Sequence, residues 1–197
     1  MNITVFAASD ISVGVKEGDL IEYQVSYSGD VPQAHDVTWA KIEVTKVEGT
    51  NIEVAVTSRY SDGTEETVTT NLNLLTGQIA DCFIIPANLN EGDTFLEQFE
   101  GTITITGVQE ETYAGAKRTV VKATTTHTEF VWDQTTGFLV DAKSTYPDSS
   151  LVTTANKTNI WHAQAFGVDP FWSIILVVLA IVVILAIFLR LRGKKRL

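Results

Sequence analysis

The chain has 197 residues, 45% of them hydrophobic, and a formal net charge of −10 at pH 7. The residues before Pro170 carry all 24 acidic side chains but only nine of the 14 basic ones, a net charge of −15. Such a surface repels phosphate backbones and anionic lipid headgroups, so the composition excludes nucleic acid as a partner of this part of the chain.

The first ten residues form a separate segment. Val5–Ser9 (VFAAS) resembles the end of a signal peptide, but no basic residue precedes it and its apolar stretch is short. We interpret residues 1–10 as the remnant of a signal segment or as an N-terminal arm. In the alternative, the apolar C-terminal segment is the sole insertion signal, which would invert the topology deduced below.

Residues 11–160 show the alternation of apolar and polar side chains that is typical of half-buried antiparallel strands. The clearest runs are Leu20–Tyr27 and Asn51–Tyr60. Further apolar faces consist of Val68, Leu72 and Leu74; Ile103 and Ile105; Phe130 and Trp132; and Phe138, Val140 and Ala142. Short connections rich in Gly, Asn and Asp favour hairpins between neighbouring strands. The sequence therefore predicts an all-β domain with a curved antiparallel meander sheet, half-barrel or sandwich-like.

A faint internal repeat runs through this domain. Lys16–Glu22 (KEGDLIE) is echoed by Asn90–Glu97 (NEGDTFLE). Each copy is followed by a hairpin and then by a Thr-Gly pair, which ends at Gly77 after the first copy and at Gly137 after the second. The spacings are 74 residues for the first pair and 60 for the second. The pattern fits a duplication with extra length in the first half, around Ser28–Asp36, although a β-meander also produces such echoes by chance.

Four segments, in this order, resemble a known group of proteins: Gly14–Tyr23, Phe83–Asp93, Tyr113–Val120 and Trp132–Leu139. The pattern is similar to that of archaeal secreted or membrane-anchored β-domains, whose outline is like the half-barrel of lipoprotein carriers. The resemblance covers residues 11 to about 161. It implies a fold rather than an activity, since that group has no established catalytic residues. The chain departs from the pattern at Leu20, where Trp is frequent, and this leaves the strand assignment intact.

Residues that could carry chemistry are few and scattered. The three histidines, His35, His127 and His162, lack metal-ligand spacing, and no nucleophile, phosphate-loop or zinc-protease motif is present. Cys82 is the single cysteine, so it forms no intrachain disulfide, and its apolar neighbours predict a small buried side chain. We expect a protein that is not an enzyme and has no cofactor or metal site.

Two Asn-x-Thr sequons flank the domain, at Asn2 and Asn156, and both are glycosylation candidates. Asn156 is the stronger candidate because it lies in the outer part of the chain. Residues 161–170 form a short juxtamembrane segment. The aromatic residues in and after it predict a belt at the headgroup level of a bilayer: Trp161, Phe166, Phe171 and Trp172.

Residues 171–189 predict a transmembrane helix. These 19 residues carry no charge. A helix of that length spans about 28 Å, close to the bilayer's hydrocarbon core of about 30 Å. The tail that follows, residues 190–197, is predicted to be a cytoplasmic anchor with five basic residues: Arg190, Arg192, Lys194, Lys195 and Arg196. By the positive-inside rule, this tail places the β-domain outside the cell.

These features together predict a single-pass protein of the cell membrane, with its C-terminus in the cytoplasm. We expect a non-enzymatic binding module or accessory subunit of a membrane or envelope complex. Its helix would lie in the lipid bilayer. Its β-domain would bind another protein, a second copy of itself, or an apolar or glycan ligand. The alternative is a structural envelope protein that self-assembles into a layer or filament through its sheet edges. A deep apolar concavity would favour ligand capture, and a filled core with a bare edge would favour assembly.

Overall fold

The computed structural model describes residues 11–29, 36–79, 81–164, 172, 174, 175, 178 and 179. The chain divides into two units, Met1–Trp161 and His162–Leu197. The N-terminal segment, the basic tail and most of the predicted transmembrane segment 171–189 lie outside the described residues. Within the described part of the chain, no helix is long and apolar enough to cross a membrane.

The described part of the first unit consists of eleven β-strands and their connections. The strands are β1 (Leu20–Gly29), β2 (Val37–Glu48), β3 (Asn51–Tyr60), β4 (Glu65–Asn73), β5 (Thr94–Glu97), β6 (Gly101–Thr104), β7 (Gly107–Tyr113), β8 (Ala116–Thr124), β9 (Thr128–Asp133), β10 (Leu139–Thr145) and β11 (Ser149–Thr158). Nine form one antiparallel sheet in the order β4-β3-β2-β1-β11-β10-β9-β8-β7, and β5 pairs with β6. The prediction of an all-β antiparallel meander is confirmed.

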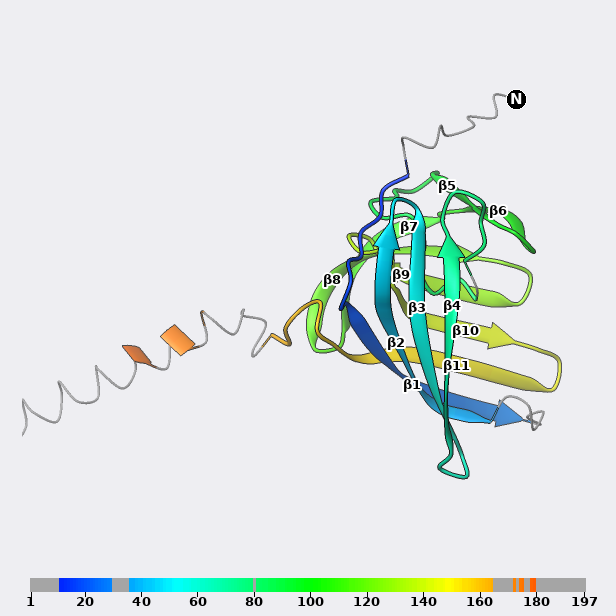
Figure 1. Cartoon of the computed structure of the whole chain (residues 1–197), viewed down its shortest axis with the longest axis horizontal. Coiled ribbons are helices and arrows are strands. Elements are labelled where there is room, and N and C mark those ends of the chain that lie inside the picture. The colour runs from blue at the N-terminus through cyan, green and yellow to red at the C-terminus, as the bar shows by residue number, and fades with distance from the viewer. Residues whose placement is uncertain are drawn as a thin grey trace, which may run out of the picture. The chain divides into compact units, whose positions relative to one another are not determined.

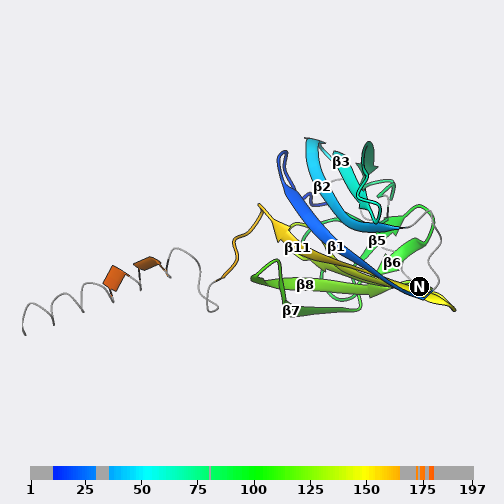
Figure 2. The same cartoon turned by 90° about the horizontal axis from the view of Figure 1, so that it is seen from below.

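The long sheet is strongly twisted. In Figure 1, the axes of β2, β3 and β4 are close to vertical while β10 and β11 lie across the page, and Figure 2 shows β1 beside β11 where the two halves of the sheet join. The twist of each strand adds to that of its neighbour, so a nine-stranded sheet turns its two ends toward one interior. One hydrophobic cluster joins both halves of the sheet to Ile84 and Ile85 and to Phe95 of β5.

Large side chains fill this interior. Tyr23 of β1 and Trp132 of β9 are fully buried. The Trp132 Nε1–H donates to the Cys82 carbonyl at 2.7 Å, and the Tyr23 hydroxyl donates to the Leu139 carbonyl at 2.8 Å. Each buried aromatic therefore has a partner for its polar atom. Phe95 packs edge-on against Trp132 with ring centroids 5.6 Å apart, so the β5–β6 hairpin closes over the sheet.

The predicted inward faces are confirmed along most strands. Ile52, Val54 and Leu72 lie in the core, as their alternation with polar neighbours predicts. The prediction is wrong for Val68, which is 52% exposed. Val68 lies toward the end of the β3–β4 hairpin that projects past the neighbouring strands (Figure 1), whereas the core packs at the other end of β4, around Leu72.

The two Gly-Asp echoes in the sequence fold into the same turn. In each, the aspartate side chain accepts the backbone N–H of the residue three positions earlier. Lys16 N–H donates to Asp19 at 3.0 Å, and Asn90 N–H donates to Asp93 at 2.7 Å. This local bond, in which Asp caps its own turn, is a recurring use of Asp in tight connections.

The backbone around these turns also matches. In the first copy, Gly18 N–H donates to the Val44 carbonyl at 2.9 Å, and Val44 N–H donates to the Asp19 carbonyl at 2.8 Å. In the second copy, Gly92 N–H donates to the Ile105 carbonyl, and Ile105 N–H donates to the Asp93 carbonyl, both at 2.9 Å. Each turn therefore starts a strand pair in the same way.

The two Thr-Gly turns match as well. The Asn73 side chain accepts the N–H of Thr76 at 3.0 Å, and the Asp133 side chain accepts the N–H of Thr136 at 2.9 Å. In the first turn, Gly77 N–H donates to the Asn73 carbonyl at 3.1 Å. In the second turn, Gly137 N–H donates to the Asp133 carbonyl at 2.8 Å. Matched turns at both ends of the two segments support duplication over chance.

In the duplication, β1 to β4 correspond to β5 to β9, with β6 and β7 together in the place of β2. The first half is longer partly because β1 has 10 residues where β5 has 4. The loop residues 30–35, to which the sequence assigns the extra length, lie outside the described residues.

The strand register can be tested with the same substitution at two valines. Val54→Asp places an unpaired carboxylate in the core and should lower the free energy of unfolding by about 3 kcal/mol or more. Val68→Asp, at an exposed position of the same hairpin, should lower it by less than about 1 kcal/mol. Urea unfolding of both variants measures the difference, and equal losses would contradict the register.

The duplicated Thr-Gly turn can be tested at Gly137. Its φ is 75°, and a Cβ there would lie 2.1 Å from the Ile85 carbonyl oxygen. Gly63 has a similar φ of 86°, but a Cβ added there would have no atom within 4 Å. Gly137→Ala should therefore destabilise the domain by about 3 kcal/mol, against about 1 kcal/mol for Gly63→Ala. Similar melting temperatures for the two variants would show that the close approach does not matter.

Candidate functional site

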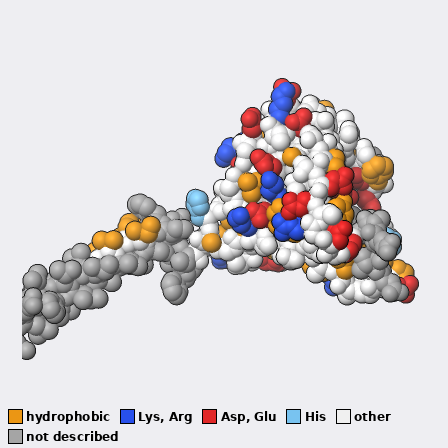
Figure 3. All heavy atoms as spheres, turned by 60° about the horizontal axis from the view of Figure 1, so that its bottom comes forward, with side chains coloured by type: hydrophobic (Ala, Val, Ile, Leu, Met, Phe, Trp, Pro, Cys, Tyr) orange, Lys and Arg blue, Asp and Glu red, His pale blue; other side chains and the backbone are white. Residues whose placement is uncertain are grey.

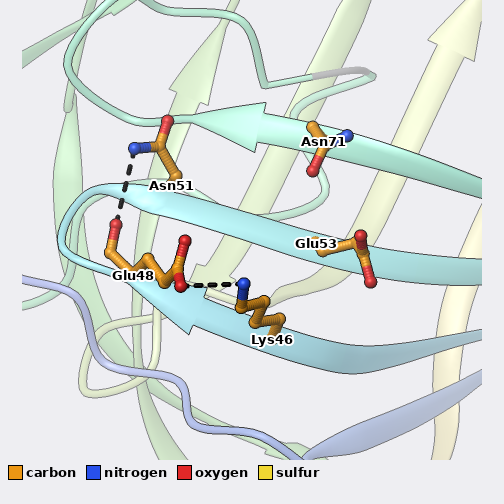
Figure 4. Close-up of a pocket in the computed structure, with 5 residues that line it drawn as sticks. All are labelled: Lys46, Glu48, Asn51, Glu53 and Asn71. Atoms are coloured by element: carbon orange, nitrogen blue, oxygen red, sulfur yellow. Dashed lines mark hydrogen bonds and ion pairs between the residues drawn. The ribbon is translucent and has the colours of Figure 1, made fainter.

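A shallow depression lies on the surface beside the β2–β3 hairpin. It has a volume of about 110 Å³ and is lined by Lys46, Glu48, Asn51, Glu53 and Asn71 (Figure 4). Lys46 pairs with Glu48 at 2.8 Å, and Glu53 accepts the Thr45 hydroxyl at 2.6 Å. Ligand pockets usually enclose about 300 Å³ or more. This depression is smaller, and its charges already have partners, so it supports neither catalysis nor capture of a lipid-sized ligand.

Two of the three histidines lie among the described residues, one in each unit of the chain. His127 stacks on Tyr146 with ring centroids 5.6 Å apart, His162 is exposed, and His35 lies outside the described residues. In the described segments, no three His, Cys, Asp or Glu side chains are arranged to hold a metal ion.

Cys82 is buried, as its apolar neighbours predict. Burial raises the pKa of its thiol to about 12, with further contributions from the negative charges of Glu97, Asp81 and Glu100. The thiolate is the reactive form of cysteine, so this thiol is inert near neutral pH. The three carboxylates that act on it belong to the connection before β5 and to the β5–β6 hairpin.

The glycosylation candidate Asn156 is exposed on β11. The hydroxyl of Thr158, the third residue of its sequon, donates to the Leu20 carbonyl at 2.5 Å. Asn2 lies outside the described residues, and glycosylation stays a prediction at both positions.

Trp161 lies within the β-domain. It is buried, its Nε1–H donates to the Tyr113 carbonyl at 3.1 Å, and the Arg118 guanidinium lies 4.7 Å from its ring centre. Arg118 in turn pairs at 2.7 Å with Asp133, which is fully buried. The indole therefore packs against an ion pair whose carboxylate is buried.

The other predicted membrane contacts belong to the second unit. Trp172 is exposed, whereas Phe166, Phe171 and the basic residues from Arg190 to Arg196 lie outside the described residues. The membrane-interface role of the aromatic residues and the anchoring role of the tail stay predictions.

Exposed apolar side chains gather at the β5–β6 hairpin. Phe99, at its tip, is 86% exposed, and Leu96 on β5 is also exposed. The turn that holds exposed Leu75 lies alongside, because Gln98 N–H donates to the Gly77 carbonyl at 2.9 Å. We call Leu75, Leu96 and Phe99 the apolar tip.

Hydrogen bonds hold the turn that carries Phe99. Glu97 is only 5% exposed, and its carboxylate accepts the N–H of Phe99 at 2.7 Å and the N–H of Glu100 at 2.6 Å. Hydrogen bonds to a carboxylate are stronger than those between neutral groups. The turn therefore holds Phe99 outward.

Sequence reasoning missed this site. Phe95, Glu97 and Phe99 follow a period of two, which places all three on one face of a strand. The chain turns at residues 98–100 instead, and Phe99 leaves that face. Gly101, with a φ of 81°, is the residue that signals the turn.

The stretch of sequence that contains the tip is acidic. Residues 60–116 contain ten carboxylates and no Lys, Arg or His. The basic side chains of the described β-domain are mostly paired. Figure 3 shows Lys and Arg beside Asp and Glu on one face, and eight of the nine basic residues in the described β-domain form ion pairs.

Among the described strands, β4 and β7 form the edges of the long sheet. Thr67–Asn73, most of β4, carries no charge. On β7, Glu110 and Glu111 pair with Lys117 and Lys122 of β8 at 2.5 and 2.7 Å. Charged side chains protect an edge from pairing with another strand, so β4 is the less protected edge.

Comparison with protein-family models and with curated proteins gives no match. Among solved structures, the chain is similar to a protein described by the words "The Siderocalin Ex-FABP functions through dual ligand specificities". The two are 10% identical, the match covers 83% of each chain, and the TM-score is 0.27. So low a TM-score does not establish a common fold, and the likeness says nothing about what this chain binds.

Proposed function

We propose that this chain is a non-enzymatic surface protein whose β-domain binds another protein, as an accessory subunit of a membrane or envelope complex. The filled interior of the sheet carries this proposal. Trp132 and Tyr23 occupy the space that a capturing half-barrel would leave open, and the β5–β6 hairpin lies over them. The domain presents its apolar contact surface on the outside, at the apolar tip.

The chemistry of the described residues supports a non-enzymatic role. Catalysis needs a reactive group beside a group that activates it, in a site that excludes water. Cys82 has a raised pKa within the core, and the carboxylates of the shallow depression are engaged by Lys46 and Thr45. Neither place combines a reactive group with room for a substrate.

The membrane anchor in this proposal is supported by the sequence. The 19 uncharged residues of 171–189 are followed by five basic residues and no acidic one. That asymmetry favours a cytoplasmic C-terminus.

Self-assembly through a sheet edge is the second candidate. It is favoured by β4, a nine-residue edge strand whose segment Thr67–Asn73 is uncharged. Two copies could pair their β4 strands antiparallel, joining the two sheets through backbone hydrogen bonds. This pairing needs no free basic side chain, unlike contacts across two acidic surfaces.

The orientation can be tested by digestion of intact cells. Protease added outside should remove the β-domain and leave a C-terminal fragment that retains an epitope tag placed after Leu197. Digestion of opened membranes should remove the tag as well. A β-domain that is protected in intact cells would contradict the proposed orientation.

The nature of the partner can be tested by native mass spectrometry of the full chain, extracted from its own membrane in mild detergent. We expect a complex with a different protein. Homo-oligomers that dissociate when Val68→Lys places a charge on β4 would instead support the second candidate, because charge blocks edge pairing. A monomer that carries only a small apolar molecule would contradict both.

A further inference from the structure

We infer that the apolar tip inserts into an apolar pocket with a basic rim on a different protein, and that Phe99 is the side chain that fills the pocket. This inference rests on the proposed function and adds to it the binding surface and the chemistry of the partner. The tip combines an aromatic residue that is 86% exposed with two exposed leucines, Leu75 and Leu96.

The geometry of the tip suits a binding anchor. Aromatic side chains that enter well-packed pockets contribute most of the free energy at many interfaces. Glu97 fixes the backbone of Phe99 and Glu100 before binding, through bonds of 2.7 and 2.6 Å. Because the turn is already ordered, little conformational entropy is lost when the partner binds.

Charge determines which class of partner fits. Asp81, Glu97 and Glu100 lie near enough to Cys82 to raise the pKa of its thiol, so their charges gather at the base of the tip. The sequence between Arg59 and Lys117 contains ten carboxylates and no basic residue. A membrane surface with anionic headgroups would repel this region, whereas a pocket rimmed by Lys or Arg would attract it.

A second copy of the chain does not fit this description. Eight of the nine basic residues in the described β-domain already pair with carboxylates of the same domain. The most buried of these pairs, Arg118 with Asp133, is covered by the Trp161 ring. The domain therefore has few free cations to form the rim of a pocket, which favours a different protein as the partner.

The test compares three variants of the full chain extracted from its own membrane. Phe99→Ser removes the aromatic ring, Glu100→Lys reverses a charge beside it, and Val68→Ser is the control at another exposed apolar position. All three should melt like the unaltered chain, since these side chains are exposed. Phe99→Ser and Glu100→Lys should each lower the population of the hetero-complex at least tenfold, and Val68→Ser should leave it unchanged.

Salt and cross-linking identify the chemistry of the pocket. Raising NaCl from about 50 to about 500 mM should weaken the complex, because salt screens the attraction between the tip and the rim. A photo-reactive phenylalanine analogue at position 99 should cross-link to a partner peptide that contains Lys or Arg among apolar residues. The same analogue at position 68 should give no such adduct.

The alternative outcomes are distinct. A hetero-complex that survives both Phe99→Ser and Glu100→Lys would overturn the role of the tip while leaving the proposed function intact. Cross-links from position 99 to lipid, or to a second copy of the chain, would also overturn it. The absence of any hetero-complex in the unaltered chain would overturn the proposed function itself.

Discussion

The structure depends on the contact between the concave face of the twisted sheet and the segment that covers it. Trp132 joins the two, because its ring lies in the sheet's core and its Nε1–H donates to the Cys82 carbonyl at 2.7 Å. Two backbone hydrogen bonds also connect the covering segment to the chain around β10. Leu139 N–H donates to the Phe83 carbonyl at 2.9 Å, and Ile85 N–H donates to the Gly137 carbonyl at 3.0 Å. An apolar concave face must be covered by protein or by a ligand. In this chain, residues of the same domain provide the cover.

The β5–β6 hairpin contributes one aromatic side chain to the core and another to the outer surface. Phe95 packs inward against Trp132, and four residues later Phe99 points outward. The change of direction depends on Glu97, whose buried carboxylate holds the two N–H groups of the turn. In the proposed binding role of the tip, Glu97 therefore affects both stability and binding. Removing its carboxylate would take away the acceptor of both turn N–H groups and would also release the backbone that holds the Phe99 ring outward.

Much of the fold could be predicted from the sequence, because alternation reports directly which side of a strand is buried. Alternation does not report which end of a strand is covered, so it misplaced Val68. It also assumes a regular strand. The register shift between Leu139 and Asp141 lets Leu139 and Val140 both be buried, which a strict period of two excludes. The candidate site was beyond prediction for a related reason: no motif marks it, and Phe99 has the spacing of an inward residue.

The duplication explains how such a tip can arise from a sheet. By the 74-residue offset between the two Gly-Asp turns, Phe99 corresponds to Val25 of β1. β1 continues through this position, pairs with β2 and β11, and buries Val25 to 8% exposure. β5 ends two residues earlier, pairs only with β6 within the described sheets, and turns. The same starting turn therefore leads to a central strand in one copy and to a short covering hairpin in the other. The position that builds the core in the first copy is free for contact with a partner in the second.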